Sequence, residues 1–275
     1  MTAVDTLSRM FGVKKPIVAM LHLPGLPGRP LHDVAGGSDA ILEPLARDLA
    51  VLQEAGVDGL LFCNEKDYPY QLKVGPEIAA AMAAAIGRLR HDIHVPFGVN
   101  LLWDPIASLA VARATGAVFI REVLTGVYES DLGIIEPHIG DITAYRAAIG
   151  ASDVALFDNV APEFSSPLGT RTLADRARGA AFMGMDAILI SGWAAGSPMA
   201  VGDLVVAKEA VSDTPVIANT GVRTEHIAEI LEVADGAIVG TSLKRDGITW
   251  NPVDPDRAMR LMDTVRALRS APTYA

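Results

Sequence analysis

Two glycine-containing turns near the end of the sequence have the pattern of a phosphate-binding site. Asn219-Thr220-Gly221-Val222 closes one apolar run, and Gly240-Thr241-Ser242-Leu243-Lys244 closes the next. Glycine lets the backbone approach an anion closely, and a (β/α)8 barrel places such turns after its last two strands. Each turn alone is also typical of an ordinary strand-to-helix connection, but the two in this order predict a phosphorylated ligand. The predicted phosphate-binding residues are Gly221, Val222, Gly240, Thr241 and Ser242, and Lys244 is either a further phosphate contact or a solvated side chain.

Polar residues follow or end nearly every apolar run of the chain. Barrel enzymes take catalytic side chains from the C-terminal ends of several strands. Any one Asn, Asp, Ser or Thr at such a position could simply be a helix N-cap. The presence of polar residues at so many strand ends is what indicates a site. Asn64, Ser191 and Asn219 are predicted to bind the substrate. The full set is His22, Asn64 with Glu65, Asn100 with Asp104, Arg121 with Glu122, Asp158 with Asn159, Ser191, Asn219 and Thr241.

Glu122 and Asp158 are the predicted acid and base, because each ends or directly follows an apolar run. A partly desolvated carboxylate near a second one has its pKa raised toward neutrality and can exchange protons with a substrate. His22 could take the same part or bind the ligand as a neutral group. Asn100 and Arg121 would orient substrate oxygens, with a structural ion pair as the alternative for Arg121.

A metal site is an open alternative, since His22, Glu122 and Asp158 could converge as ligands of a divalent cation. Nothing in their spacing fixes such a site, and the sequence has no His-x-His motif or cysteine cluster. No cofactor is predicted. Cys63 is expected to be a buried, unreactive thiol rather than a nucleophile.

Composition limits the class of protein. The chain has 275 residues, of which 50% are hydrophobic, and a formal net charge of −10. This length suits one (β/α)8 barrel over residues 1–275, with residues 1–15 as an N-terminal extension. The negative charge argues against nucleic-acid binding. A single cysteine and the lack of a signal or membrane-spanning run lead us to expect a cytoplasmic protein without a membrane partner.

Short apolar runs alternate with alanine- and leucine-rich segments of helical periodicity. Uniformly apolar runs suit parallel strands that are covered on both faces. A doubly wound open sheet is the alternative, but the prolines in the turn after the first run do not fit its glycine-rich fingerprint. The expected strands are Ile17–His22, Gly59–Asn64, Phe97–Leu102, Val118–Val123, Val154–Phe157, Ala187–Ser191, Val216–Asn219 and Gly236–Gly240. The expected helices lie near Asp39–Ala55, Pro76–Leu89, Pro105–Thr115, Thr143–Ile149, Arg171–Met183, Ala200–Val211, Glu225–Val233 and Pro255–Leu268.

Four long connections interrupt this alternation, and all of them follow expected strands: Pro24–Ser38, Glu65–Gly75, Leu124–Asp141 and Asn159–Thr170. In a barrel they would meet on the C-terminal face, where loops of this length form lids or binding loops.

These motifs resemble the BtpA/SgcQ family of TIM-barrel proteins over nearly the whole chain. The resemblance is carried by Met20-Leu21-His22-Leu23-Pro24-Gly25-Leu26-Pro27-Gly28, by Gly98-Val99-Asn100 and Phe119-Ile120-Arg121, and by the run from Asp235 to Lys244. It implies a barrel whose glycine turns are similar to those of phosphate-binding barrels such as phosphoribosylanthranilate isomerase. Members of the family are often associated with carbohydrate use.

The chain departs from the family pattern at three strand ends. Cys63 replaces a usual glutamate, Trp103 an arginine, and Phe157-Asp158 a lysine-histidine pair. The displaced carboxylate could then be supplied by Glu65, Glu122 or Asp158.

The resulting hypothesis is an enzyme that acts on a phosphorylated sugar or nucleoside-like molecule by acid/base chemistry, as an isomerase, epimerase or aldolase-type lyase. The alternatives are a non-catalytic assembly or stability factor, which the family name implies, and a metal-dependent hydrolase. A homo-oligomer is expected.

Overall fold

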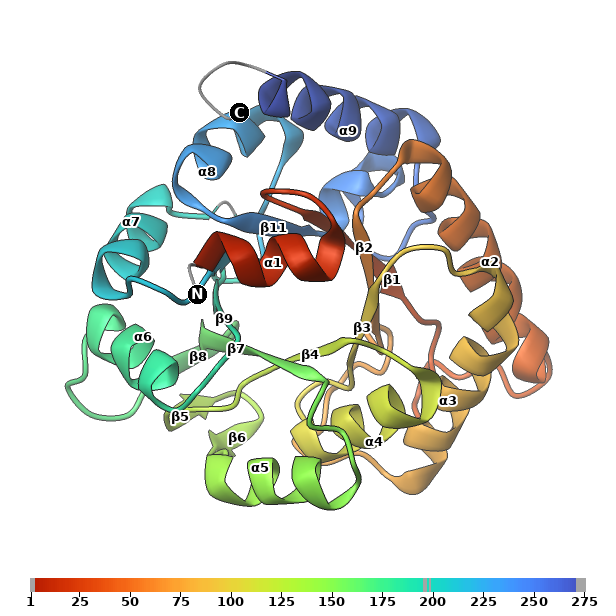
Figure 1. The fold of residues 1–275 in the computed structure, drawn as a ribbon. Helices are drawn as coiled ribbons and strands as arrows, with labels where there is room; N and C mark the ends of the chain where they lie inside the picture. The colour runs from red at the N-terminus through yellow and green to blue at the C-terminus, as the bar shows by residue number, and fades with distance from the viewer. Residues whose placement is uncertain (1–2, 195–196, 198, 271–275) are drawn as a thin grey trace.

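Eight parallel strands close into a barrel in the computed structural model, which describes residues 3–194, 197 and 199–270. The strand order around the barrel is β1-β11-β10-β9-β7-β4-β3-β2. A helix follows each strand and packs outside the barrel (Figure 1). The strands are β1 Ile17–His22, β2 Gly59–Cys63, β3 Phe97–Asn100, β4 Phe119–Glu122, β7 Ala155–Ala161, β9 Ala187–Ile190, β10 Val216–Ala218 and β11 Gly236–Val239. This architecture confirms the predicted (β/α)8 fold.

The outer helices begin and end where local sequence signals allow. Proline occupies the first helical position of α3, α4 and α9, where its missing N–H costs nothing, and Asp104 caps α4 through its side chain. Gly56 and Gly116 end α2 and α4 in the left-handed conformation. The helices are α2 Gly37–Ala55, α3 Pro76–Leu89, α4 Pro105–Thr115, α5 Ile139–Ala148, α6 Leu173–Phe182, α7 Val201–Ala210, α8 Ile227–Val233 and α9 Pro255–Arg269.

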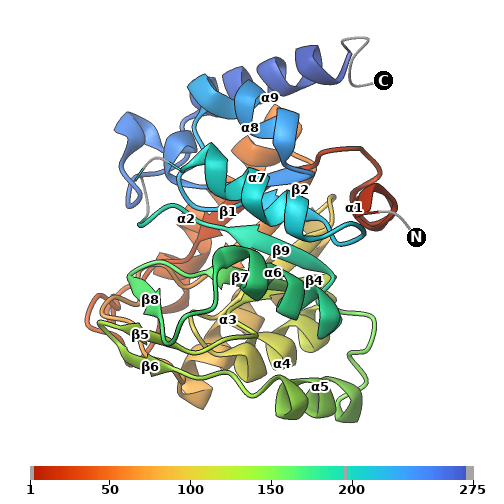
Figure 2. The same ribbon diagram turned by 90° about the vertical axis from the view of Figure 1, so that its left-hand side faces the viewer.

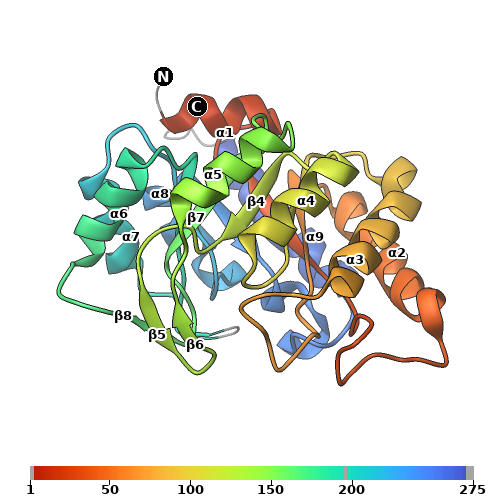
Figure 3. The same cartoon turned by 90° about the horizontal axis from the view of Figure 1, so that it is seen from below.

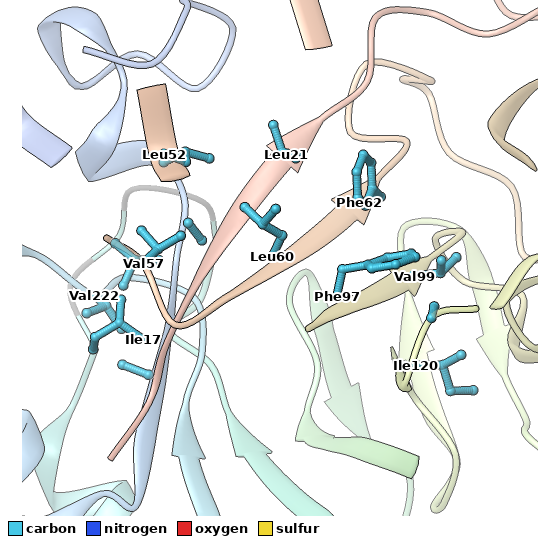
Figure 4. Close-up of a cluster of buried hydrophobic side chains, with 14 of the residues drawn as sticks. Ile17, Leu21, Leu52, Val57, Leu60, Phe62, Phe97, Val99, Ile120 and Val222 are labelled. Atoms are coloured by element: carbon cyan, nitrogen blue, oxygen red, sulfur yellow. The ribbon is translucent and has the colours of Figure 1, made fainter. Parts of the chain in front are cut away.

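The main hydrophobic core lies between the strands and the outer helices. Leu60 and Phe62 of β2, Val99 of β3 and Leu52 of α2 all belong to this layer (Figure 4). The residues that alternate with these along each strand point into the barrel. This alternation decides which side chain at a strand end faces the barrel axis and which faces the helices.

The end of one strand and the start of one helix each differ from the expectation by four residues. β7 continues through Asp158 and Asn159 to Ala161, with an irregular pairing to β9 between Asn159 and Ala161. Helix α5 begins four residues earlier than predicted, at Ile139. Polar residues inside β7 and a glycine in the first turn of α5 hide these boundaries in the sequence.

Two of the long connections form a small sheet that the sequence does not predict. β5 (Tyr128–Ser130) pairs antiparallel with β6 (Gly133–Ile135) and with β8 (Ser165–Pro167). Figures 2 and 3 show this sheet at one end of the barrel and helix α1 at the other. The connections after β4 and β7 are therefore ordered together beside the mouth.

Helix α1 (Ala3–Phe11) covers the N-terminal end of the barrel (Figure 1). It occupies most of the predicted extension 1–15, whose first two residues lie outside the described part of the chain. Leu7 and Phe11 are buried, and the Phe11 ring packs edge-on against Phe119, which in turn stacks on Phe157. The extension is thus part of the barrel's inner core.

Candidate active site

A cavity of about 570 Å³ lies at the C-terminal ends of the barrel strands. Its walls come from the loops after β2, β3, β7, β10 and β11, from Arg121 of β4 and from α9. The floor includes Met20 and Ile238, and one wall is formed by Leu102, Trp103 and Phe164. The cavity combines this apolar surface with charged groups of both signs, as small-molecule sites usually do.

All five predicted phosphate-binding residues line this cavity: Gly221, Val222, Gly240, Thr241 and Ser242. Gly221 has φ +95°, a conformation that glycine adopts without strain. A Cβ at Gly240 would lie 3.1 Å from Met20 Cγ and 3.4 Å from His22 Nε2, so a larger residue would crowd the floor. The hydroxyl of Ser242 is buried and has no hydrogen-bond partner among the described residues.

Arginine side chains from outside the two turns reach the same corner of the cavity. Arg223 follows the β10 turn, and Arg257 and Arg260 come from α9. Arg257 Nη1 donates to the backbone oxygen of Ser242 at 3.3 Å, which ties α9 to the β11 turn. The sequence analysis did not predict the α9 arginines, because the sequence of a helix does not show which strand end lies next to its first turn.

Arg121 lies at the centre of a buried polar cluster opposite that corner. Its Nη2 donates to Glu163 Oε1 at 3.0 Å, and its Nη1 donates to Asn100 Oδ1 at 3.1 Å. The amide oxygen of Asn219, oriented toward the guanidinium, accepts from Nη2 at 3.0 Å and from Nε at 3.3 Å. Arg121 is therefore an ion-pair partner of Glu163, and not of Glu122 or Asp158.

Glu163 is a cavity-lining carboxylate that the sequence analysis did not identify. It follows Ala161-Pro162 inside the connection after β7, away from any apolar run. Its Oε1 accepts from the hydroxyl of Thr220 as well as from Arg121, and its Oε2 accepts from Asn159 Nδ2 at 3.0 Å. Glu163 thus joins the β10 turn to the Arg121 cluster. The sequence does not indicate that Glu163 reaches the β10 turn, because this depends on how the loop after β7 folds.

Among the described residues, Glu65 is another of the four carboxylates that line the cavity, the others being Glu163, Glu225 and Asp246. Its Oε1 accepts from the Tyr70 hydroxyl at 3.2 Å, and its Oε2 lies 3.6 Å from Cys63 Sγ. Burial raises the pKa of Glu65, against the opposing charge of Arg121, and the charge of Glu163 raises it further. A carboxyl group with a raised pKa at a cavity wall can both accept and donate a proton. Burial also raises the pKa of the Cys63 thiol, which stays protonated.

His22 lines the floor beside Gly240. Burial lowers its pKa well below the ordinary value, and the positive charge of Lys244 lowers it further. The imidazole is therefore neutral, and its Nδ1 has no hydrogen-bond partner among the residues described. A neutral imidazole can donate one hydrogen bond and accept another.

Glu122 and Asp158 do not line the cavity. Glu122 follows inward-facing Arg121 and so points outward to α4, where Ser108 Oγ donates to its Oε1 at 2.6 Å. Asn100 Nδ2 donates to the same oxygen at 2.7 Å. Asp158 accepts from the N–H of Leu124 at 2.8 Å and from the Thr125 hydroxyl at 2.6 Å, and so fastens the connection after β4.

The remaining predicted residues lie behind the cavity wall or away from it. Asn64 bridges loops, accepting from the N–H of Leu102 at 2.8 Å and donating to Asp67 at 2.9 Å. Asn100 and Ser191 contact the lining residues Arg121 and Asn219 without lining the cavity themselves. Of the three predicted substrate-binding residues, Asn219 alone is a lining residue.

Lys244 is buried and is not among the residues that line the cavity. Its side chain is 2% exposed, and its Nζ donates to Asp48 Oδ2 of α2 at 2.9 Å. Burial lowers the Lys244 pKa, while the Asp48 carboxylate raises it. Within the described ranges, no three His, Cys, Asp or Glu side chains are placed to hold a metal ion, and His22, Glu122 and Asp158 do not converge.

A closed eight-stranded parallel barrel with its cavity at the C-terminal strand ends places this protein in the TIM-barrel class. Within that class, the model of the BtpA family matches residues 13–267. The chain belongs to the BtpA family, as its motifs predict.

Two relatives illustrate the family. The putative sgc region protein SgcQ of Escherichia coli (strain K12) is 42% identical over 264 residues, a match that covers 96% of this chain and 98% of that protein. The Photosystem I biogenesis protein BtpA of Synechocystis sp. is 34% identical over 272 residues, covering 97% of this chain and 94% of that protein.

Solved structures of TIM-barrel enzymes share the fold at low identity. Phosphoribosyl anthranilate isomerase from Thermococcus kodakaraensis matches with a TM-score of 0.54 and 13% identity, over 92% of this chain and 99% of that one. A tryptophan synthase structure from M. tuberculosis matches with a TM-score of 0.59 and 18% identity, over 96% of this chain and 97% of that one. No helix within the described residues is both long and apolar enough to cross a membrane.

Proposed function

We propose that this protein is an enzyme that transfers protons on a phosphorylated sugar or nucleoside-like molecule, as an isomerase, epimerase or lyase. One observation carries the proposal. One cavity combines two glycine turns, flanked by arginines and by the carboxylates Glu225 and Asp246, with the carboxylates Glu65 and Glu163 and a buried guanidinium. An anion-binding corner fixes the substrate, and groups able to move protons face it from the opposite wall.

The phosphate would bind between the β10 and β11 turns. Backbone N–H groups of Gly221, Val222, Thr241 and Ser242 can approach it closely, and the Ser242 hydroxyl offers a further donor. Arg257 and Arg260 add positive charge in a chain whose net charge is −10. Three arginines, Arg223, Arg257 and Arg260, lie at this corner beside two carboxylates, Glu225 and Asp246, and this excess of positive groups in a negative protein supports a specific anion site there.

Glu65 is the proposed general acid and base. It lines the cavity, and burial raises its pKa, which favours uptake of a proton from a substrate. Arg121 and neutral His22 would hydrogen-bond the substrate oxygen that gains negative charge as a proton leaves carbon. Glu163 holds Arg121 in place through their 3.0 Å ion pair. Glu122 and Asp158 are proposed to position these groups, through Asn100 and the β4 connection, rather than to touch the substrate.

The test is solvent-proton exchange. Ribose 5-phosphate, glucose 6-phosphate and other sugar phosphates are incubated with the protein in D₂O, and NMR follows deuterium entering carbon-bound positions. We expect exchange with at least one sugar phosphate, and a loss of at least a hundredfold in Glu65→Gln. Glu54→Gln, which makes the same change on the exposed face of α2, should retain the rate. Full exchange in Glu65→Gln would refute the assignment of the acid and base.

A second candidate function is that of an assembly or stability factor. The relative from Synechocystis sp. is named as a Photosystem I biogenesis protein. Val127, Ile134 and Leu168 expose apolar surface on and beside the small sheet at the mouth, which would suit a protein partner. The two functions predict different results in a thermal shift assay. No stabilisation by any sugar phosphate or by inorganic phosphate would favour the assembly factor.

A further inference from the structure

The cavity carries charged groups of both signs on two sides, with Glu225 and Asp246 beside the arginines of the phosphate corner and Arg121 beside Glu65 and Glu163. The arginines of the phosphate corner come from the loop after β10 and from α9, whereas the carboxylates Glu65 and Glu163 come from the loops after β2 and β7. In the strand order of the barrel, β10 and β11 lie across from β3 and β4. A substrate held by its phosphate at the arginine corner therefore extends its other end toward Arg121 of β4 and toward the carboxylates Glu65 and Glu163, whose loops follow β2 and β7, the strands that flank β3 and β4.

Among the described residues that line the cavity on that side, Arg121 is the one cation, and most of its N–H donors are already hydrogen-bonded. Glu163, Asn100 and Asn219 occupy four of the five N–H donors that a guanidinium has. A carboxylate binds arginine through two parallel N–H donors, which Arg121 does not have free. The positive charge of Arg121 is also matched by Glu163 at 3.0 Å, so it attracts a further anion weakly.

The far wall instead presents acceptors. Glu65 carries oxygens at the cavity surface that receive one hydroxyl donor, from Tyr70 at 3.2 Å, and Glu163 lies beside it across Arg121. A substrate hydroxyl or amino group can donate to these oxygens. A substrate carboxylate would face two protein carboxylates with one guanidinium between them, in a setting where burial strengthens repulsion.

We propose that the substrate carries hydroxyl or amino groups, and no carboxylate, at the end opposite its phosphate. This inference rests on the proposed function and narrows its substrate class to sugar or amino-sugar phosphates, excluding phosphorylated sugar acids. Glu65 is the residue that sets this preference.

The test uses pairs of ligands that differ at one end. Glucose 6-phosphate and glucosamine 6-phosphate are compared with 6-phosphogluconate, and erythrose 4-phosphate with 4-phosphoerythronate, by isothermal titration calorimetry. Inorganic phosphate is measured alongside. We expect the neutral or amino member of each pair to bind at least tenfold more tightly than its acid. In Glu65→Gln this ratio should fall to about threefold or less, and in Glu54→Gln it should be unchanged.

The outcomes separate the two proposals. Equal or tighter binding of the acids, with phosphate still competing, overturns the inference and leaves the phosphate site standing. No binding by any of these phosphates overturns the proposed function and, with it, the inference. An unchanged ratio in Glu65→Gln assigns the preference to another residue and refutes the role given to Glu65. If that variant does not fold, the ratios measured on the unmodified protein still decide the substrate class.

Discussion

Lys244→Met is expected to destabilise the protein strongly without removing its anion site. The substitution keeps most of the side-chain length but deletes the ammonium group that pairs with Asp48 at 2.9 Å. The side chains of Lys244 and Asp48 are only 2% and 9% exposed, so solvent cannot replace the lost partner. Asp48 would keep one hydrogen bond, from the N–H of Val253 at 3.0 Å.

The magnitude follows from this burial. Removing one partner of a buried ion pair costs about 3–5 kcal/mol, because the remaining charge is left without compensation. Unfolding a chain of 275 residues has an entropy of about 0.6 kcal/mol/K at roughly 2.1 cal/mol/K per residue. The melting temperature should therefore fall by about 5–8 °C.

Differential scanning calorimetry of four proteins measures the effect. These are the unmodified chain, Lys244→Met, Asp48→Asn and the double variant. Asparagine keeps an oxygen for the N–H of Val253 but carries no charge. The double variant should recover at least half of the loss, since no buried charge is left unpaired. The rise in melting temperature that a bound sugar phosphate produces should persist in all four.

Two results would refute this reasoning. A single variant that melts within about 1 °C of the unmodified chain would mean that the pair contributes nothing net. A ligand-induced shift that disappears in Lys244→Met but persists in Asp48→Asn would make Lys244 itself a phosphate ligand.

Three further changes probe the groups around the cavity. Burial raises the pKa of Glu122 to about 8. The folded protein thus keeps a proton that the unfolded chain releases near pH 4.3, and stability should fall by up to about 1.4 kcal/mol per pH unit between about pH 4.5 and 8. Calorimetry across this range should show a flatter profile for Glu122→Gln, and identical profiles would contradict the assignment. Asp158→Asn disturbs the hydrogen bonds to Leu124 and Thr125, so urea unfolding should show a loss of about 1–2 kcal/mol with sugar phosphate affinity retained. Lost turnover at unchanged stability would instead place Asp158 in the chemistry. Gly240→Ala presses a methyl group to 3.1 Å from Met20 and should weaken sugar phosphate binding in titration calorimetry at least fivefold. Gly87→Ala, in open space on α3, serves as its control and should leave binding unchanged.

The barrel could be predicted from the sequence because its strands are buried on both faces. Runs such as Ala187–Ile190 are apolar throughout, and glycine or proline separates them from the helices. Helix α1 and the small mouth sheet could not be predicted in this way. Leu7 and Phe11 stabilise α1 only by docking under the barrel, and β8 consists of Ser165-Ser166-Pro167, which has no strand pattern of its own.

The candidate site could be predicted in part. The glycine turns carry their own backbone signal, and all five predicted phosphate-binding residues line the cavity. The carboxylates that line the cavity were harder to predict, because the end of an apolar run does not show whether a side chain faces the barrel axis or the outer helices. Counting the two-residue alternation from Arg121 would have turned Glu122 toward the helices. Glu163 depends on how the connection after β7 folds, which local pattern does not encode.

The sealed base of the barrel has a kinetic consequence. Leu7 and Phe11 of α1, with the stacked rings of Phe119 and Phe157, fill the interior beneath the cavity. Within the described residues this leaves the mouth as the opening of the cavity, so in the proposed enzyme a product would have to leave before the next substrate could bind. Product and substrate would then exclude each other, and accumulated product should slow turnover competitively.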